Sequence, residues 1–161
     1  MASTSRTAAR RRARVKALQG LYQWDLNQAA GNDPDSADIA KQFHISQDMD
    51  GVDEAYFEEL LSGTTAGLEK LDTALASSLD RPVLELDPIE RSICRLGAYE
   101  LADRLDVPLR VVINEWVEIS KRFGSDQGYK YINGVMDKLG AFLRETESTA
   151  LRQSAIKPDS K

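Results

Sequence analysis

Apolar residues recur every three or four positions along most of the chain, which is the spacing of one face of an α-helix. No stretch shows the sustained alternation of apolar and polar residues that is typical of a strand. Near the N-terminus this spacing predicts a helix over residues 7–27, with Ser5 or Thr7 as its cap. The apolar stripe of this helix consists of Val15, Leu18, Tyr22 and Leu26.

Residues 28–53 hold six aspartates and one lysine and predict an acidic surface excursion with one small helix over 36–43. A long helical pattern then runs over residues 52–79. Gly63 and Gly67 weaken this pattern and mark a bend or a break into two helices.

The clearest helix start lies at Asp87, which is followed by Pro88 at the first helical position and Glu90 two positions later. It predicts a helix over 88–103 that is apolar on several sides and therefore central. Two further helices are expected over 108–123 and, capped by Ser125, up to residue 143. The pattern as a whole predicts an all-α fold, a single compact domain of about six to seven helices over residues 1–146, followed by a disordered tail over 147–161.

The amino-acid composition argues against metal-binding, cofactor-dependent and membrane-spanning functions. The 161 residues include one cysteine, Cys94, and one histidine, His44, which are too few for a four-ligand zinc site, so no metal is expected. The glycines have neither the dinucleotide-binding nor the P-loop spacing, so we expect no cofactor and no enzyme. No apolar run approaches the ~20 residues of a membrane span, and no secretory signal is evident, which favours a cytoplasmic protein without membrane contact.

Charge is strongly segregated along the chain. Six of the 21 basic residues and no acidic one lie within residues 1–16, whereas the remaining 145 residues carry a net charge of -11. Arginine clusters attract phosphates because guanidinium groups stay charged and bind them through paired hydrogen bonds. The pattern predicts one localised nucleic-acid contact and a basic protein partner for the acidic remainder.

The arginines also bear on the geometry of the first helix. Arg11 and Arg14 lie within about 40° of the apolar stripe on a helical wheel. Because unpaired guanidinium groups are too costly to bury, the first turns are expected to overhang the core and to suit a flexible single strand. With about four to six phosphate contacts, the logarithm of the RNA affinity should fall against the logarithm of salt with a slope of roughly -3 to -4.

A second basic and aromatic group lies at residues 129–131, where Lys130 stands between two tyrosines. Aromatic rings stack on unpaired bases, so this group is a candidate for base contact. Tyr129 is on the core stripe and is expected to be buried, which leaves Lys130 and Tyr131 as the more exposed candidates. An alternative interpretation of the N-terminal arginines is a frayed basic tail that only aids solubility.

Three stretches together resemble the NusB family of transcription antitermination and termination factors. They are residues 9–14 (ARRRAR) leading into 21–24 (LYQW), residues 89–101 (IERSICRLGAYEL), and residues 112–124 (VINEWVEISKRFG) continued by 130–138 (KYINGVMDK). The resemblance covers most of residues 8–143. It implies an all-helical, non-enzymatic protein that binds the boxA element of nascent ribosomal RNA leaders as single-stranded RNA. It also implies a heterodimer with NusE, a small-subunit ribosomal protein, which joins an RNA polymerase antitermination complex.

The resemblance also implies the residues of the two interfaces. The partner NusE would contact Tyr22 and Glu90, although Glu90 fits a helix-capping role equally well. Family members often have an acidic residue at the position of Gln127 and phenylalanine at that of Tyr131, and the tyrosine keeps a stacking ring. The implied RNA contacts are Arg10, Arg11, Arg12, Arg14, Arg95, Gln127, Lys130 and Tyr131.

A competing hypothesis is a protein-only interaction or self-assembly module. In that case the arginine-rich end of one copy would dock on the acidic body of another, giving a homodimer that occludes the RNA surface.

Overall fold

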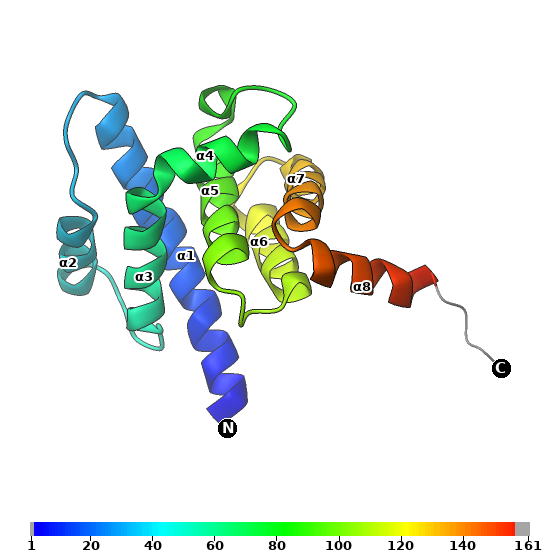
Figure 1. The fold of residues 1–161 in the computed structure, drawn as a ribbon. Helices are drawn as coiled ribbons and strands as arrows, with labels where there is room; N and C mark the ends of the chain where they lie inside the picture. Colours follow the sequence, from blue (N-terminus) through cyan, green and yellow to red (C-terminus); the bar gives the residue numbers. More distant parts are fainter. Residues whose placement is uncertain (1, 157–161) are drawn as a thin grey trace.

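The computed structural model describes residues 2–156, with side chains for residues 6–154, and this part of the chain is helical (Figure 1). It contains eight α-helices, one more than the upper end of the expected range, and one short 3₁₀ turn, η1 (Val83–Glu85). The α-helices are α1 (Ala2–Ala29), α2 (Ser36–Ser46), α3 (Glu54–Ala66), α4 (Leu68–Ala76), α5 (Pro88–Asp103), α6 (Leu109–Phe123), α7 (Gly128–Leu143) and α8 (Glu145–Ile156). The predicted all-α fold is confirmed.

Helix α5 lies at the centre of the bundle and packs against α1, α3, α4, α6 and α7. Every residue from Arg91 to Leu101 is buried, as expected for a helix that is apolar on several sides. The predicted start is also confirmed, because the Asp87 carboxylate accepts a hydrogen bond from the Glu90 backbone N–H and Pro88 occupies the first turn. This helix therefore places residues 91–101 within reach of charged groups on several neighbours.

Helix α1 runs along α3 and α5 (Figure 1) and buries one stripe against them. The helix begins at Ala2, upstream of Ser5 and Thr7, so neither residue occupies the predicted cap position. Its buried apolar residues are Ala13, Ala17, Leu18, Leu21 and Trp24. Of the predicted stripe only Leu18 is buried, whereas Val15 and Tyr22 are half-buried and Leu26 is 48% exposed, so the buried face is turned toward Ala17 and Leu21.

The acidic excursion contains the predicted small helix, α2, and this helix is more than a surface feature. It buries Ile39, Ala40 and Phe43, and the Phe43 ring stacks on Phe57 of α3 with centroids 5.5 Å apart. The linker before α2 is fixed as well, since the Trp24 indole N–H donates to the Pro34 carbonyl at 3.1 Å. The excursion is therefore part of the packed domain.

The long pattern over residues 52–79 divides at Gly67, which ends α3 and precedes α4. This is the break that the two glycines indicate. The other glycine, Gly63, lies inside α3 against the Tyr99 side chain, where an added Cβ would meet two ring carbons at 2.3 and 2.6 Å and the hydroxyl oxygen at 2.9 Å.

The C-terminal part differs from the prediction of a disordered tail from residue 147 onward. Helix α8 occupies Glu145–Ile156, where Leu151 packs on the core and the Glu147 carboxylate accepts a hydrogen bond from the Leu109 backbone N–H at 2.7 Å. Between α7 and α8, the buried Arg144 donates to the carbonyl oxygens of Glu100, Leu101, Arg104 and Val107. The remaining residues, 157–161, lie outside the described residues.

Candidate nucleic-acid interface

Two of the four predicted arginines of α1 are exposed. The Arg11 side chain is 57% exposed and donates to both carboxylate oxygens of Glu115 on α6, at 3.0 and 2.8 Å. Arg12 is exposed and its Nη1 lies 3.5 Å from the Gly51 carbonyl oxygen. Both guanidinium groups are accessible to a phosphate, although Arg11 already has one anionic neighbour.

Arg14 is buried instead, so the expectation that these turns overhang the core is wrong at this position. Its side chain is 3% exposed, and its Nε and Nη2 each donate to the Glu100 carboxylate at 2.8 Å. Burial lowers the pKa of Arg14, but the hydrogen bonds and charge of Glu100 outweigh that effect and the net pKa is raised. A stripe can bury this guanidinium because its counterion is buried with it.

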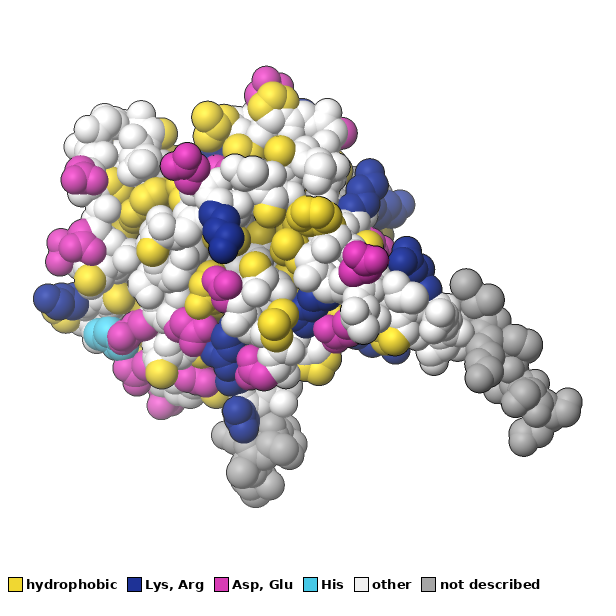
Figure 2. Space-filling model, viewed as in Figure 1, with side chains coloured by type: hydrophobic (Ala, Val, Ile, Leu, Met, Phe, Trp, Pro, Cys, Tyr) yellow, Lys and Arg dark blue, Asp and Glu magenta, His cyan; other side chains and the backbone are white. Residues whose placement is uncertain are grey.

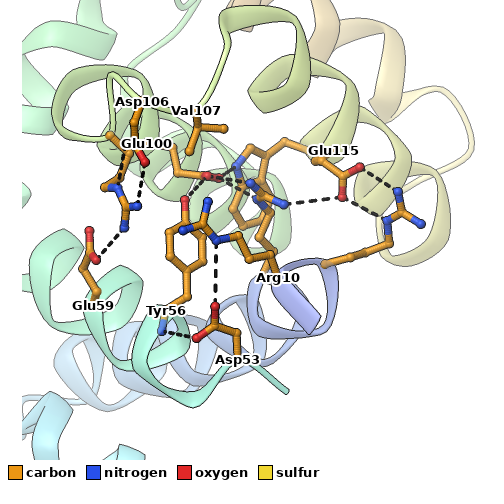
Figure 3. Close-up of polar contacts among 12 residues, drawn as sticks. Arg10, Asp53, Tyr56, Glu59, Glu100, Asp106, Val107 and Glu115 are labelled. Carbon is orange, nitrogen blue, oxygen red and sulfur yellow. Dashed lines mark hydrogen bonds and ion pairs between the residues drawn. The ribbon is translucent and has the colours of Figure 1, made fainter. Parts of the chain in front are cut away.

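Glu100 on α5 is the centre of this buried network (Figure 3). Besides Arg14, it accepts hydrogen bonds from the Tyr56 hydroxyl and, at 2.7 Å, from the Trp116 indole N–H. Burial and the neighbouring carboxylate raise the pKa of the Tyr56 hydroxyl, which therefore remains a donor. The network joins α1, α3, α5 and α6 through a single carboxylate.

Arg10 lies at the edge of the same cluster, with its side chain 20% exposed. Its guanidinium is 4.5 Å from the centre of the Tyr56 ring, and its Nε is 3.8 Å from an Asp53 carboxylate oxygen (Figure 3). Arg104 lies at 4.9 Å from the same ring. These contacts hold Arg10 close to the body.

A small pocket of 170 Å³ opens beside these arginines, between the start of α1 and the start of α6. Its lining is both basic and acidic, so it does not present a uniformly positive wall. The lining residues are Arg6, Thr7, Arg10, Arg14, Asp106, Val107, Pro108, Val111 and Glu115.

The second predicted group lies at the start of α7. Gln127 and Lys130 are exposed, and the Gln127 side chain makes no capping hydrogen bond. The Tyr131 ring is half-buried against the core, its hydroxyl donates to Asp80 at 2.9 Å, and the Arg81 guanidinium lies 5.3 Å from the ring centre. The sequence pattern does not single out Arg81, because its position depends on this contact between residues far apart in the chain.

Tyr129 and Ser125 also differ from expectation near this end. Tyr129 is half-buried rather than buried, and the Lys121 ammonium lies 5.2 Å from its ring centre. Helix α7 begins at Gly128 without a side-chain cap, while the Ser125 hydroxyl donates to Glu90 at 3.1 Å. The Ser125 cap prediction is therefore wrong.

Arg95, a further residue implied by the resemblance, lies inside the bundle with a side chain that is 3% exposed. Its guanidinium donates to Asp72 at 2.9 and 2.8 Å and to Asp25 at 3.2 Å. The guanidinium is thus fully engaged by two carboxylates, and RNA on the surface cannot reach it without displacing them. This placement corrects the expectation of a direct contact.

The two candidate partner-binding residues lie on α1 and at the start of α5. Tyr22 is half-buried, and Leu26, one turn further along α1, is 48% exposed. The Glu90 side chain accepts from Ser125 instead of reaching back to the Asp87 backbone, so only the backbone of Glu90 takes part in capping. The carboxylate is therefore not committed to the cap of α5.

Acidic side chains crowd other parts of the surface. Figure 2 shows them around His44, the only histidine, where α2 meets α3. The two imidazole nitrogens of His44 lie 2.9 Å from Glu54 and 2.8 Å from Glu58. This face would repel a phosphate backbone.

In residues 2–156, no three or more His, Cys, Asp or Glu side chains are arranged to hold a metal ion. No helix in that range combines the length and the apolar character needed to cross a bilayer.

Comparison with known proteins places this arrangement in a family. The sequence is 49% identical over 152 residues to the transcription antitermination protein NusB of Marinomonas sp. (strain MWYL1), covering 93% of this chain and 84% of that protein. It is 49% identical over 146 residues to the protein of the same name from Nitrosococcus oceani, covering 89% and 95%. The solved structure of T. maritima NusB superposes with a TM-score of 0.74 at 25% identity, covering 87% of this chain and 96% of that one. Since the family model of NusB also matches residues 11–141, the chain belongs to the NusB family.

Proposed function

We propose that this chain is a transcription antitermination factor that binds the boxA element of nascent ribosomal RNA leaders as an unpaired strand. In this role it acts in the cytoplasm as an adaptor rather than an enzyme, and loads onto RNA polymerase together with NusE. The names of its relatives support antitermination.

The observation that carries the RNA-binding part is the exposed pair Arg11 and Arg12 on α1. Guanidinium groups bind phosphates through a planar edge. Arg12 can present such an edge, and Arg11 can present the edge that its pair with Glu115 leaves open. Lys130 and Gln127 supply further polar groups at the start of α7. The contact set therefore consists of the exposed members of the predicted group, while Arg14 and Arg95 hold the scaffold together.

The protein partner is proposed to bind near Tyr22 and Glu90. The exposed Leu26 and the exposed Leu84, which lies in η1 shortly before α5, offer apolar area on these same segments. A basic ribosomal protein suits a surface that carries the carboxylate of Glu90, which accepts a hydrogen bond from the neutral Ser125 hydroxyl. The acidic excess of the body would also attract such a partner at long range.

The test is RNA binding by the double variant Arg11→Gln, Arg12→Gln. Losing two phosphate contacts should weaken binding to a boxA-like single strand by about 10- to 100-fold at moderate salt, without loss of helicity. Arg152→Gln, at an exposed arginine of α8, is the matched control and should bind as the wild type does. Unchanged binding by the double variant would refute the role assigned to this surface.

Light scattering with and without the RNA separates this function from self-assembly. An adaptor whose arginines contact RNA should not form a tight dimer that is indifferent to RNA. A dimer of that kind would favour the protein-only hypothesis instead.

A further inference from the structure

Three side chains form a connected group where the linker between α4 and α5 meets the start of α7, and none of them is an arginine of α1. Asp80 and Arg81 lie in the linker, and Tyr131 lies in the first turn of α7. The Tyr131 hydroxyl donates to Asp80 Oδ1 at 2.9 Å, which ties the linker to α7.

One of the two hydrogen-bonding edges of Arg81 is occupied by Asp80. Its Nε donates to Asp80 Oδ1 at 2.8 Å and its Nη2 to Asp80 Oδ2 at 3.0 Å. The bonds from Arg81 and then from Tyr131 lower the pKa of Asp80 to about 2, so the carboxylate stays charged at neutral pH. The pair is held in one orientation, and its net charge is close to zero.

The pair with Asp80 uses neither the Nη1 amino group nor the flat surface of the Arg81 guanidinium. One side lies over the Tyr131 ring at 5.3 Å from the centre, and the side chain is 49% exposed. Tyr131 itself is half-buried against the core beneath it. The outermost flat surface at this end of the molecule is therefore the guanidinium and not the tyrosine ring.

We propose that Arg81 is a stacking platform for one unpaired base of the RNA, with Tyr131 as its support and Asp80 as its positioning residue. Guanidinium planes stack on bases as aromatic rings do. A charge-neutralised edge disfavours a phosphate at the same place, whereas the exposed Lys130 next to Tyr131 can bind the phosphate that flanks the stacked base. This inference rests on the proposed RNA-binding function. It adds an RNA contact, Arg81, that is not among the contacts predicted from the sequence.

The test compares Arg81→Lys and Arg81→Ala with wild type on one boxA-like strand and on versions of it with a single abasic residue at each position in turn. Lysine keeps the charge but lacks the plane. Both variants should lose about 5- to 100-fold in affinity, the range given by one stacked base, without a change in salt dependence. One abasic position should weaken wild type by the same factor and abolish the difference between wild type and both variants.

Arg152→Lys is the matched control and should bind every strand as wild type does. If Arg81→Lys binds as tightly as wild type while Arg81→Ala lowers the salt slope by about 0.7, Arg81 is a phosphate contact and the stacking proposal is overturned. Equal losses by the variants on every abasic strand would overturn it as well. Failure of wild type itself to bind any strand would instead overturn the proposed function, and this inference with it.

Discussion

At the scale of single residues, the Glu100 carboxylate decides whether α1 can bury a charged residue in its apolar stripe. Two oxygens receive donors from Arg14, Tyr56 and Trp116 in a site that is closed to water. The ion pair satisfies both of its members, but it is favourable only as long as both charges are present.

The variant Glu100→Gln should therefore be strongly destabilised. The amide removes the negative charge and turns one acceptor into a donor that faces the guanidinium of Arg14. Leaving a buried charge without its partner costs about 3 to 5 kcal/mol, measured as a fall in the free energy of unfolding in urea. Glu118→Gln, which breaks an exposed pair with Lys121, should change that free energy by less than about 0.5 kcal/mol.

A double variant separates charge from packing in the same site. Adding Arg14→Met to Glu100→Gln removes the unpaired guanidinium and should recover a large part of the lost stability. If Glu100→Gln alone is as stable as wild type, the buried pair does not have the role described here.

Cys94 provides a second test at this scale. Burial, and to a smaller extent the charge of Glu90, raise the pKa of its thiol to about 12. At about pH 8 the thiolate fraction in the folded protein is then on the order of 10⁻⁴, so alkylation by iodoacetamide should be negligible. In concentrated urea the thiol should react at the rate of a free cysteine, and a native rate equal to that one would contradict the burial of this side chain.

At the scale of elements, two glycines in neighbouring helices should respond to alanine with opposite signs. A Cβ at Gly134, on the exposed side of α7, would meet no atom within 4 Å. Gly134→Ala should raise stability by about 0.5 to 1 kcal/mol because alanine restricts the unfolded chain. In α5, a Cβ at Gly97 would lie 2.7 Å from Met136 Sδ, so Gly97→Ala should cost about 1 to 3 kcal/mol. Thermal unfolding of both variants measures the two shifts, and a lowered melting temperature for Gly134→Ala would contradict the first.

The spacing of apolar residues predicts where α1, α5, α6 and α7 lie in the sequence, because this spacing is a local property of each helix. This local spacing does not indicate which carboxylates will pair with buried arginines. Arg14 meets Glu100 and Arg95 meets Asp25 and Asp72 across large sequence separations, so both arginines look exposed from the sequence and are buried in the fold. The arginines that remain outside, Arg11 and Arg12, are predicted correctly as surface residues for the converse reason, since no fully buried carboxylate lies opposite them.

Helix α8 shows the same limit at the chain's far end. Its sequence has a weak apolar pattern. Its attachment depends on the hydrogen bond from the Leu109 backbone N–H, at the start of α6, to the Glu147 carboxylate, and on the bonds from Arg144 to four carbonyl groups. These are tertiary hydrogen bonds to backbone atoms, which no side-chain pattern encodes. Disorder is thus the natural expectation from sequence for residues that the fold holds in place.

At the scale of the whole molecule, the charge segregation of the sequence is partly cancelled within the fold. Glu100 neutralises the charge of Arg14, and Glu115 forms an ion pair with Arg11. The net positive charge that the N-terminal residues present at the surface is therefore less than six. The acidic body keeps its excess negative charge. Under the proposed function, this charge would favour RNA binding at the surfaces around the exposed Arg12 and Lys130.

The salt dependence of RNA binding measures how many of these charges act. Under the proposed function, the exposed cations Arg6, Arg11, Arg12 and Lys130 would make about three to four phosphate contacts. On a single strand this predicts a slope of roughly -2 to -3, shallower than the -3 to -4 expected when every N-terminal arginine is available. Arg12→Gln should make the slope shallower by about 0.7, whereas Arg152→Gln should leave it unchanged. A wild-type slope steeper than -4 would mean that RNA draws Arg14 or Arg95 out of their ion pairs, and a slope near zero would mean that phosphate contacts do not drive binding.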